Sequence, residues 1–577
     1  MPAVLLLFNF LVTPGLMAQD TLTEPVQIPE YDPDNSTHFL ISTRDDWSRI
    51  NDLSLRFFYV EPHSDYGTVF INSSGSDTAR RTISLYNGNN DHPAKLDRSE
   101  QANVRMVFNN AHYWTVDRMS TFDPGDVTCF MIRNRSTNII LNRLHLSGFR
   151  DGVNIRGPSS PPYTENITVQ NSRMDRMTPD AIDDDRIAIL LSGEVWNHDR
   201  TIVNTRIVNN EIRNCNDGVL LASHPEQGYE VDYRGTTIAR NHIYVDQEVY
   251  TNGNGVHDPE GRWSWTENAV DLKGGSEDPE NPVCVCNNIF WGFRRTDEDG
   301  GGSGSSGSAV TGHFYVENVV IRDNLIFNSN RGIVFADPSG LPHSVENGVI
   351  SGNILYNIGH STSGGIEYGN YFYHSKNVDF TGNTMVFNDR QARWISVDNN
   401  EEDLDVTSNI IVDAYQQTGR RTATTRFADN IFYITQMTRL NDGIYFNSTE
   451  TATQRDTTFV TDRFTLHPRN ITLPGVIVIP TITGDGPVEQ EGKEWLTVHP
   501  NPFTGTATIL YVVSEPSHVT LKAFDASGML VDDIVSRSHR EGSYLVVWEP
   551  AGIPGGVYFC EMSTGSFRVV RRMILVN

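Results

Sequence analysis

The sequence predicts an all-β protein, a right-handed parallel β-helix followed by a small antiparallel β-sandwich. Short β-branched runs that end in asparagine recur along the middle of the chain. No long segment shows the helical period, which removes helical architectures. From Leu496 onward, the sequence pattern changes to longer runs of alternating apolar and polar residues separated by turn residues, which is typical of a small β-sandwich. These three observations define a solenoid with a separate C-terminal module.

The parallel β-helix is predicted by a repeated sequence motif: a β-branched run, an asparagine and an apolar residue. Neighbouring asparagines are 21 to 47 residues apart, a spacing typical of stacked coils. Asparagine tolerates the left-handed turn conformation, and its amide can bond to the asparagine of the next coil. The asparagines of the phrase are Asn171, Asn210, Asn241, Asn288, Asn324, Asn353, Asn383, Asn409 and Asn430.

A second phrase predicts how the coils align. It begins with Gly or Ala at positions 152, 218, 269, 309, 332 and 365, followed by Val or Ile and then alternating residues. Alternation sends the second and fourth residues into the core and the third and fifth outward. Because coils stack about 4.8 Å apart, Lys273 and His313 should be neighbours. The outward third residues are Asn154, Leu220, Asp271, Thr311, Val334 and Glu367, and the fifth are Arg156, Ala222, Lys273, His313, Ala336 and Gly369.

Domain boundaries follow from composition. Residues 1–18 combine a short apolar stretch with a small residue at Ala18, which predicts a signal peptide; a buried N-terminal strand is the alternative. The β-helix is expected over residues 19–470, with 19–135 forming the N-terminal cap and first coils. Residues 471–493, rich in proline and glycine, read as a linker, and residues 494–577 form the sandwich.

The sandwich closely resembles the C-terminal sorting domain of type IX secretion cargo. The matching stretches are Pro500–Phe503, Asp525–Gly528, Gly555–Tyr558 and the basic pair Arg571–Arg572. The resemblance implies the type IX machinery as a partner, export across the outer membrane, and a final location that is secreted or attached to the cell surface. An immunoglobulin-like carbohydrate-binding module is the alternative.

Charge and cysteine content restrict the partners. A net charge of −27 argues against nucleic acid, because phosphate binding requires clustered Lys and Arg. An acidic polysaccharide would also be repelled unless the site supplies local positive charge or a cation. We expect a monomer. The cysteines (Cys129, Cys215, Cys284, Cys286 and Cys560) are expected to be buried free thiols, because two residues on the same face of a strand do not suit a simple disulfide.

The richest outward constellation is Glu267-Asn-Ala-Val-Asp-Leu-Lys-Gly-Gly, ending at Gly275. It resembles the calcium-and-lysine sites of β-helical polysaccharide lyases of families 9 and 6. By resemblance to family 9, Glu267, Asn268 and Asp271 would bind Ca²⁺, although asparagine replaces one carboxylate. Asp217 and Asp246 are candidates to complete that site. By resemblance to family 6, Lys273 would be the base, assisted by Arg294 or its neighbour Arg295.

The chemistry explains why these residue types belong together. Cleavage removes the C5 proton of a uronate, which is too weakly acidic unless a cation or arginine neutralises the carboxylate. A free lysine has a pKa of about 10.4, so the base also needs a nearby cation or desolvation. Lys273 is therefore the predicted base, and His313 or Arg294 the donor to the leaving oxygen. Arg295, Arg156 and Glu367 are predicted substrate-binding residues. The plain alternative is a surface lysine paired with Asp271.

The remaining sequence features give weaker indications of function. Asp183–Asp185 reads as a solvated turn and only second as metal ligands or a glycosidase pair. His198 and Asp199 read as a surface turn, and the Gly/Ser-rich stretch 297–308 as a loop. The signatures of pectin hydrolases of family 28 are absent, so hydrolysis is a secondary alternative. A non-catalytic glycan-binding adhesin is the rival from another class, since a solenoid can also serve as a binding scaffold.

Overall fold

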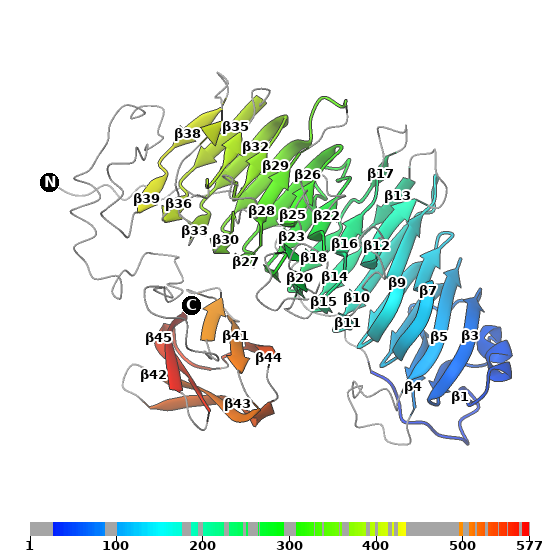
Figure 1. The fold of residues 1–577 in the computed structure, drawn as a ribbon. Coiled ribbons are helices and arrows are strands. Elements are labelled where there is room, and N and C mark those ends of the chain that lie inside the picture. The colour runs from blue at the N-terminus through cyan, green and yellow to red at the C-terminus, as the bar shows by residue number, and fades with distance from the viewer. Residues whose placement is uncertain are drawn as a thin grey trace. The chain divides into compact units, whose positions relative to one another are not determined.

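In a computed structural model, the described residues form β-strands joined by turns and loops, with one short 3₁₀ helix (Figure 1). The structure describes residues 27–433 and 496–575 with gaps, of which the longer ones in the first part are 87–100, 176–185, 194–199, 224–229, 246–249, 252–262, 294–306, 360–367, 388–392, 398–401, 413–417 and 420–424. Residues 1–461 and 462–577 form two compact units. Within the described residues, no helix is long and apolar enough to cross a membrane.

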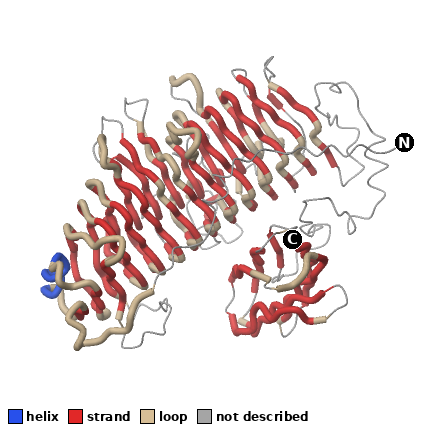
Figure 2. The backbone as a smooth tube through the Cα atoms, turned by 180° about the vertical axis from the view of Figure 1, so that it is seen from behind, coloured by secondary structure: helices blue, strands red, loops and turns tan. Residues whose placement is uncertain are grey.

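The first unit is a parallel β-helix whose strands stack into three sheets (Figure 1; Figure 2). Sheet 1 contains β1 (His38–Ile41), β2 (Phe57–Val60), β4 (Arg81–Leu85), β6 (His112–Asp117), β8 (Thr137–Asn142), β10 (Thr164–Gln170), β14 (Arg206–Val208), β18 (Thr237–Ala239), β23 (Val283–Cys286), β26 (Val316–Arg322), β29 (Val345–Ser351), β32 (Ser375–Thr381), β35 (Glu402–Thr407) and β38 (Arg426–Ala428), with β13 (Arg200–Val203) and β17 (Val231–Asp232) pairing beside it.

Sheets 2 and 3 complete each coil. Sheet 2 contains the short strands β11 (Arg173–Asp175), β15 (Glu211–Arg213), β19 (His242–Tyr244), β24 (Ile289–Trp291), β27 (Leu325–Phe327), β30 (Ile354–Tyr356), β33 (Thr384–Val386), β36 (Ile410–Val412) and β39 (Ile431–Tyr433). Sheet 3 contains β3 (His63–Ile71), β5 (Ala102–Asn109), β7 (Ser120–Arg133), β9 (His145–Gly157), β12 (Ile187–Gly193), β16 (Asp217–Leu221), β22 (Asn268–Leu272), β25 (Ser308–Gly312), β28 (Arg331–Phe335), β31 (Tyr371–Phe372), β34 (Ser396–Val397) and β37 (Thr418–Gly419). The long strand β9 pairs with both β11 and β12, so it runs through both sheets.

One continuous apolar core fills the solenoid. Alternation places every second residue of a strand inside, as with Val270 and Leu272 of β22 and Val219 and Leu221 of β16. Parallel in-register pairing then stacks equivalent residues of successive coils, so like packs on like along the axis. Strands β20 (Tyr250–Thr251) and β21 (Trp263–Ser264) form a separate short antiparallel pair.

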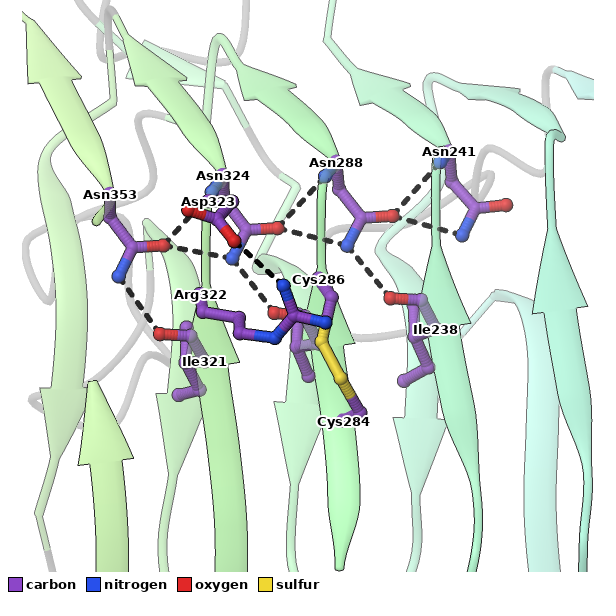
Figure 3. Close-up of a disulfide and its surroundings, with 11 residues drawn as sticks. Ile238, Asn241, Cys284, Cys286, Asn288, Ile321, Arg322, Asp323, Asn324 and Asn353 are labelled. Carbon is purple, nitrogen blue, oxygen red and sulfur yellow. Dashed lines mark hydrogen bonds and ion pairs between the residues drawn. A yellow bond between two sulfur atoms is a disulfide. The ribbon is translucent and has the colours of Figure 1, made fainter. Parts of the chain in front are cut away.

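Buried asparagines form a ladder between sheets 1 and 2 (Figure 3). Nδ2 of Asn288 donates to Oδ1 of Asn324 at 3.0 Å and to the carbonyl oxygen of Ile238 at 2.8 Å. The same bonds recur from Asn210 to Asn430. The predicted bonding between the amides of successive coils is confirmed. It also satisfies the hydrogen-bonding groups of these side chains, which are buried away from water.

The ladder also corrects two details of the sequence analysis. The residue in the left-handed conformation is the one before the ladder asparagine, such as Asn287 with φ of 57°. Asn171 (φ 54°) occupies that preceding position and accepts from Nδ2 of Asn209 at 2.6 Å. Ser172 takes the ladder position of its coil, its backbone N–H donating to Oδ1 of Asn210 at 3.0 Å.

The register of sheet 3 agrees with the second phrase only in part. Leu220, Asp271, Thr311 and Val334 are successive partners, as predicted. Leu190 of β12 lies between Asn154 and Leu220, so an additional coil was missed. Tyr371, four residues after Glu367, is the partner of Val334. The glycine-led motif predicts where strands begin, but it does not predict how many residues the intervening turns contain, and so it cannot fix the register between all coils.

The cysteine prediction was wrong for one pair. Cys284 and Cys286 of β23 form a disulfide, with Cα atoms 5.8 Å apart, which lies within the usual disulfide range (Figure 3). Two residues on the same face of an extended strand are thus close enough to pair. Both sulfurs lie in a small apolar cluster outside the main core, beside Val208, Ala239 and Val320. Cys129, Cys215 and Cys560 are buried free thiols, as expected.

The N-terminal end of the solenoid is closed by the 3₁₀ helix η1 (Asp45–Asn51), which buries Trp47 and Ile50. Arg81 of β4 enters this end almost fully buried and lies 4.5 Å from the ring centroid of Trp114. Its guanidinium donates to the carbonyl oxygens of Leu55 and Asp52 at 3.2 and 2.6 Å. Burial lowers the pKa of Arg81 to about 10, and these bonds tie the cap to the first coils.

The second unit is an antiparallel sandwich with its own core. One sheet contains β40 (Leu496–His499), β41 (Ala507–Val513) and β44 (Gly542–Trp548), and the other β43 (Leu530–His539), β42 (Ser517–Asp525), β45 (Gly556–Ser563) and β46 (Arg568–Leu575). Within it, Nε of Arg571 donates to the carbonyl oxygen of Leu496 at 2.8 Å, which joins the last strand to the first.

Candidate functional site

Adjacent coils of sheet 3 bring Lys273 and His313 together. Leu272 of β22 pairs with Gly312 of β25, and the backbone N–H of His313 bonds to the carbonyl of Leu272 at 2.9 Å. The following residues, Lys273 and His313, therefore occupy the same position on successive coils. Both lie on the outer face, with 22% of the Lys273 side chain and 9% of the His313 side chain exposed.

Asp271 lies between them and is almost fully buried. Its Oδ2 is 3.5 Å from Nζ of Lys273, and its Oδ1 is 2.9 Å from Nε2 of His313. Burial alone would raise the pKa of Asp271, but His313 and Lys273 outweigh it and hold this pKa below its ordinary value. The cluster is thus a carboxylate that contacts two proton-carrying groups.

Phe314 is part of the cluster, and sequence reasoning missed it. Its ring stacks on the His313 imidazole, with centroids 4.6 Å apart, and lies 5.9 Å from Nζ of Lys273. Its φ of 76° is unusual for an aromatic residue. Strained backbone of this kind concentrates at functional sites, but no one-dimensional pattern signals it.

Tyr315 begins a second polar group directly beyond His313. Its hydroxyl lies 2.8 Å from Oε1 of Glu317 and 2.9 Å from Oε2 of Glu346. Nζ of Lys376 lies 2.7 Å from the other oxygen of Glu346. Although burial opposes it, the bonds from Lys376 and Tyr315 lower the pKa of Glu346. Burial and both carboxylates raise the pKa of Tyr315, so its phenol stays protonated.

A small recess of about 20 Å³, which is room for about one water molecule, opens where β22 and β25 end. Gly274 and Tyr315 line it, which follow Lys273 and His313 by one and two residues. The described lining contains four carboxylates and no lysine, arginine or histidine. The lining carboxylates belong to Glu230, Asp232, Glu277 and Glu317.

The expected calcium ligands that the structure describes do not come together as one group. Asn268 and Asp217 share the inward alternation of their strands: Oδ1 of Asn268 accepts from the N–H of Ser308 at 3.3 Å, and Oδ1 of Asp217 from the N–H of Asn268 at 3.2 Å. Glu267 and Asp271 are four residues apart, about 13 Å along an extended strand. Among the residues with described positions, no group of three or more His, Cys, Asp or Glu side chains could hold a metal ion.

Other predicted residues lie away from this cluster or outside the described structure. Arg156 is on the outer face of β9, with Nε donating to Oδ1 of Asn154 at 3.3 Å, and pairs with Ser192 of the next coil. Three coil steps separate it from Lys273. Outside the described residues lie Asp246, Arg294, Arg295, Glu367, Asp183–Asp185, His198, Asp199 and most of the stretch 297–308.

Chemically, the cluster of Asp271, Lys273 and His313 can hold an anionic group and transfer protons. Lysine supplies a cation, and imidazole changes charge near neutral pH. Asp271 contacts both and can orient either one for transfer. Buried ionisable groups held close together are characteristic of sites that perform acid–base chemistry, although structural ion pairs share this feature.

No protein-family model matches the sequence, and no curated protein matches it. Solved structures with similar folds include an alginate lyase from Paenibacillus sp. str. FPU-7 (13% identity, TM-score 0.32, 59% of this chain and 98% of that chain). A GH136 lacto-N-biosidase from Eubacterium ramulus is 13% identical (TM-score 0.38, 69% and 68%). The tailspike protein of E. coli bacteriophage HK620, solved with a pentasaccharide, is 11% identical (TM-score 0.35, 87% and 88%). Similarity this distant assigns no activity to the chain.

Proposed function

We propose that this protein is a polysaccharide lyase that cleaves a uronic-acid-containing polymer by β-elimination at Asp271, Lys273 and His313. One observation carries the proposal: a lysine and a histidine from successive coils contact the same buried carboxylate on the outer face of the solenoid. In a chain with a net charge of −27, local positive charge of this kind is what an anionic polymer requires.

The reaction assigns a role to each group. The amine of Lys273 removes the C5 proton of the uronate, the C4–O4 bond breaks as the C4=C5 double bond forms, and protonated His313 donates to O4. Asp271 is a positioning residue that holds both groups. Positioned acid–base catalysis of this kind contributes about 10²- to 10⁴-fold.

One observation favours a different assignment, in which His313 rather than Lys273 is the base. The Asp271 carboxylate, 3.5 Å from Nζ, stabilises the ammonium form of Lys273. Neutral His313 would then remove the C5 proton and, once protonated, pass it to O4 as the C4–O4 bond breaks, while Lys273 would neutralise the uronate carboxylate. The two assignments make different demands on position 273, because only the first requires a group there that can lose a proton.

Calcium remains a prediction, and no step is routed through it. The described ligands lie apart, so a bound Ca²⁺ would have to take its oxygens from elsewhere in the chain or from substrate. Chelation before the assay tests this: unchanged activity argues against calcium, whereas loss that Ca²⁺ restores supports it.

Export is proposed on separate grounds. The C-terminal sandwich would act as the type IX sorting domain, leaving the β-helix secreted or attached to the cell surface. The Cys284–Cys286 disulfide supports an oxidising compartment, since such bonds are rare in the cytosol. Fractionation of cells expressing the full chain and a chain truncated after residue 470 tests it: retention of only the truncated chain is expected, and export of both would contradict the proposal.

The reaction is tested with purified full-length protein on pectate, alginate and unsulfated chondroitin. Elimination produces the ultraviolet absorbance of a C4=C5 double bond together with new reducing ends. Reducing ends without that absorbance would establish hydrolysis instead. Binding without either product would support a non-catalytic adhesin.

A further inference from the structure

We propose, on the basis of the lyase function above, that Tyr368, Tyr371, Tyr373 and Arg393 form a second binding site for the same polymer. We call this group the tyrosine platform. Its three rings hold a sugar ring, and its guanidinium pairs with a uronate carboxylate. The polymer then lies along the solenoid axis, across successive coils of sheet 3, from the cluster at Lys273 to the platform.

The platform lies on the outer face of sheet 3, as the cluster does. Phe372 of β31 points into the main apolar core, so alternation directs Tyr371 and Tyr373 outward. Both of these side chains are partly exposed, and so is that of Tyr368, which precedes the strand. Solvent therefore reaches the platform from the side of the solenoid on which the cluster lies.

Register fixes the separation between the cluster and the platform, since β22, β25 and β28 follow one another along the axis (Figure 1). The backbone N–H of Ala336 bonds to the carbonyl oxygen of Gly312 at 2.9 Å. On the next coil, the backbone N–H of Tyr373 bonds to the carbonyl oxygen of Phe335, also at 2.9 Å. Tyr373 therefore occupies the position of His313 two coils further on, about 10 Å away. A sugar unit of an extended chain is about as long as one coil is high, so a sugar on the platform is at least about two units from the cluster.

The rings of the platform lie close together. The ring centroids of Tyr368 and Tyr371 are 6.0 Å apart, and those of Tyr371 and Tyr373 are 6.1 Å apart. The Tyr373 ring also stacks on the imidazole of His374, with centroids 4.2 Å apart. A sugar ring presents C–H groups on its faces and hydroxyl groups at its edge, so it packs on aromatic side chains while its polar groups stay hydrated. The platform thus suits a sugar ring.

Arg393 supplies the positive charge that an anionic polymer requires. It pairs with Tyr368 across adjacent coils, and its guanidinium carbon lies 5.3 Å from the centroid of the Tyr368 ring. Its Nη1 donates to the Tyr368 hydroxyl at 3.0 Å. Within the part of the chain that the structure describes, no carboxylate forms an ion pair with Arg393. A guanidinium has five N–H donors in a planar fork, so this one keeps donors for a uronate carboxylate.

A site at this distance contributes binding rather than chemistry. It contacts neither the C5 proton nor O4, so it stabilises the bound substrate and the transition state equally. Such uniform binding lowers KM and leaves kcat unchanged. Only chains long enough to reach the platform gain this binding, so its effect depends on chain length.

The test uses the full-length protein and oligosaccharides of whichever polymer it cleaves among pectate, alginate and unsulfated chondroitin. A tetrasaccharide cut into disaccharides extends one unit beyond the sugars at the cut and does not reach the platform, whereas an octasaccharide cut at its centre does. Tyr373→Ala and Arg393→Gln should each raise KM for the octasaccharide by about three- to tenfold at low salt. Neither variant should change kcat or the kinetics on the tetrasaccharide. Tyr373→Phe keeps the ring and should behave as wild type.

Two variants of sheet 1 are matched controls. Tyr113→Ala removes a partly exposed tyrosine whose ring centroid is 5.9 Å from the guanidinium of Arg80. Arg426→Gln removes a positive charge from β38. Both should leave KM for the octasaccharide unchanged. An unchanged octasaccharide KM in Tyr373→Ala and Arg393→Gln, or equal losses on both oligosaccharides, would overturn the inference.

If no polymer is cleaved, the lyase function fails, and the platform is tested by electrophoresis in gels with and without each polymer. Retardation that Tyr373→Ala and Arg393→Gln weaken, and that Tyr113→Ala leaves intact, would support the platform as a glycan-binding site. The absence of retardation, or equal retardation of these variants and the wild-type chain, would contradict it.

Discussion

Nε2 of His313 lies 2.9 Å from Oδ1 of Asp271, although the two residues belong to successive coils. The contact exists because the parallel strands, in register, place His313 beside Lys273, and Asp271 precedes Lys273 by two residues on the same face. Asp271 is buried beside Leu220 and Thr311, its partners on the neighbouring strands. A carboxylate in such surroundings must be compensated, and Lys273 and His313 provide the compensation.

Replacement of Lys273 should separate the two role assignments. Lys273→Ala is expected to lower kcat/KM for elimination by about 10²- to 10⁴-fold, because one assignment needs a base at this position and the other needs a cation. Lys273→Arg keeps the positive charge but cannot act as a base. Activity as low as that of the alanine variant would identify Lys273 as the base, and recovery to within about tenfold of wild type would identify it as the neutralising cation.

A matched control for these variants is Lys522→Ala in the C-terminal unit, where Lys522 lies 3.9 Å from Asp533. It removes a lysine from another surface ion pair and should leave elimination unchanged. Full activity of Lys273→Ala would contradict the proposed site.

Asp271→Asn should destabilise the fold in a pH-dependent way. The pKa of Asp271 is lowered in the folded state, so its ionisation contributes stability above the unfolded pKa of about 3.9. That stability is lost as pH falls through the lower folded-state pKa. The variant should therefore lose about 3 kcal/mol in the free energy of unfolding at pH 7, and the difference from wild type should shrink below about pH 4. Urea titrations at both pH values measure it; a difference independent of pH would contradict the role of charge.

The sequence was sufficient to place the proposed catalytic pair side by side, but not to predict its surroundings. Lys273 and His313 could be aligned because period-two alternation and coil stacking are local rules that a glycine-led phrase reveals. Leu190 and Tyr371 were missed because turn lengths differ between coils, and no residue pattern counts them. Asn171 was placed one position off because the left-handed residue and the ladder residue are adjacent, and asparagine suits both.

The recess and Phe314 were beyond sequence reasoning for another reason. The recess is formed by residues from several coils, among them Glu230, Glu277 and Tyr315, whose proximity depends on how turns leave the sheets. Glu267 and Asp271, two of the expected calcium ligands, are close in sequence but are separated by the full rise of a strand. Short sequence spacing implies proximity in a helix or turn, whereas an extended chain separates the same residues.

The Cys284–Cys286 disulfide should contribute little to stability. It closes a loop of only three residues, so it removes little entropy from the unfolded chain, about 1–2 kcal/mol. The double variant Cys284→Ala, Cys286→Ala should therefore remain folded and lose no more than that in urea titrations. Peptide mapping without reductant should find the two cysteines joined and Cys215 free; free thiols at all three positions would contradict the pairing.

Asn324→Ala should be far more costly than its size suggests. The Asn324 amide accepts from both the N–H and Nδ2 of Asn288 and donates to Asn353 and to the carbonyl of Val285. Alanine would leave these buried groups without partners, at a cost of about 1–3 kcal/mol each, so a total of at least about 3 kcal/mol is expected.

The control for this variant is Asn377→Ala. Asn377 donates to Asn347 at 2.6 Å in a similar coil-to-coil bond, but on the exposed surface, where water can replace the lost partner. Its loss should cost less than about 1 kcal/mol. Both are measured as the urea midpoint of the first unit's unfolding. Equal midpoints for the two variants would mean that stacked apolar side chains alone hold the coils in register, and that the buried ladder contributes nothing beyond a surface hydrogen bond.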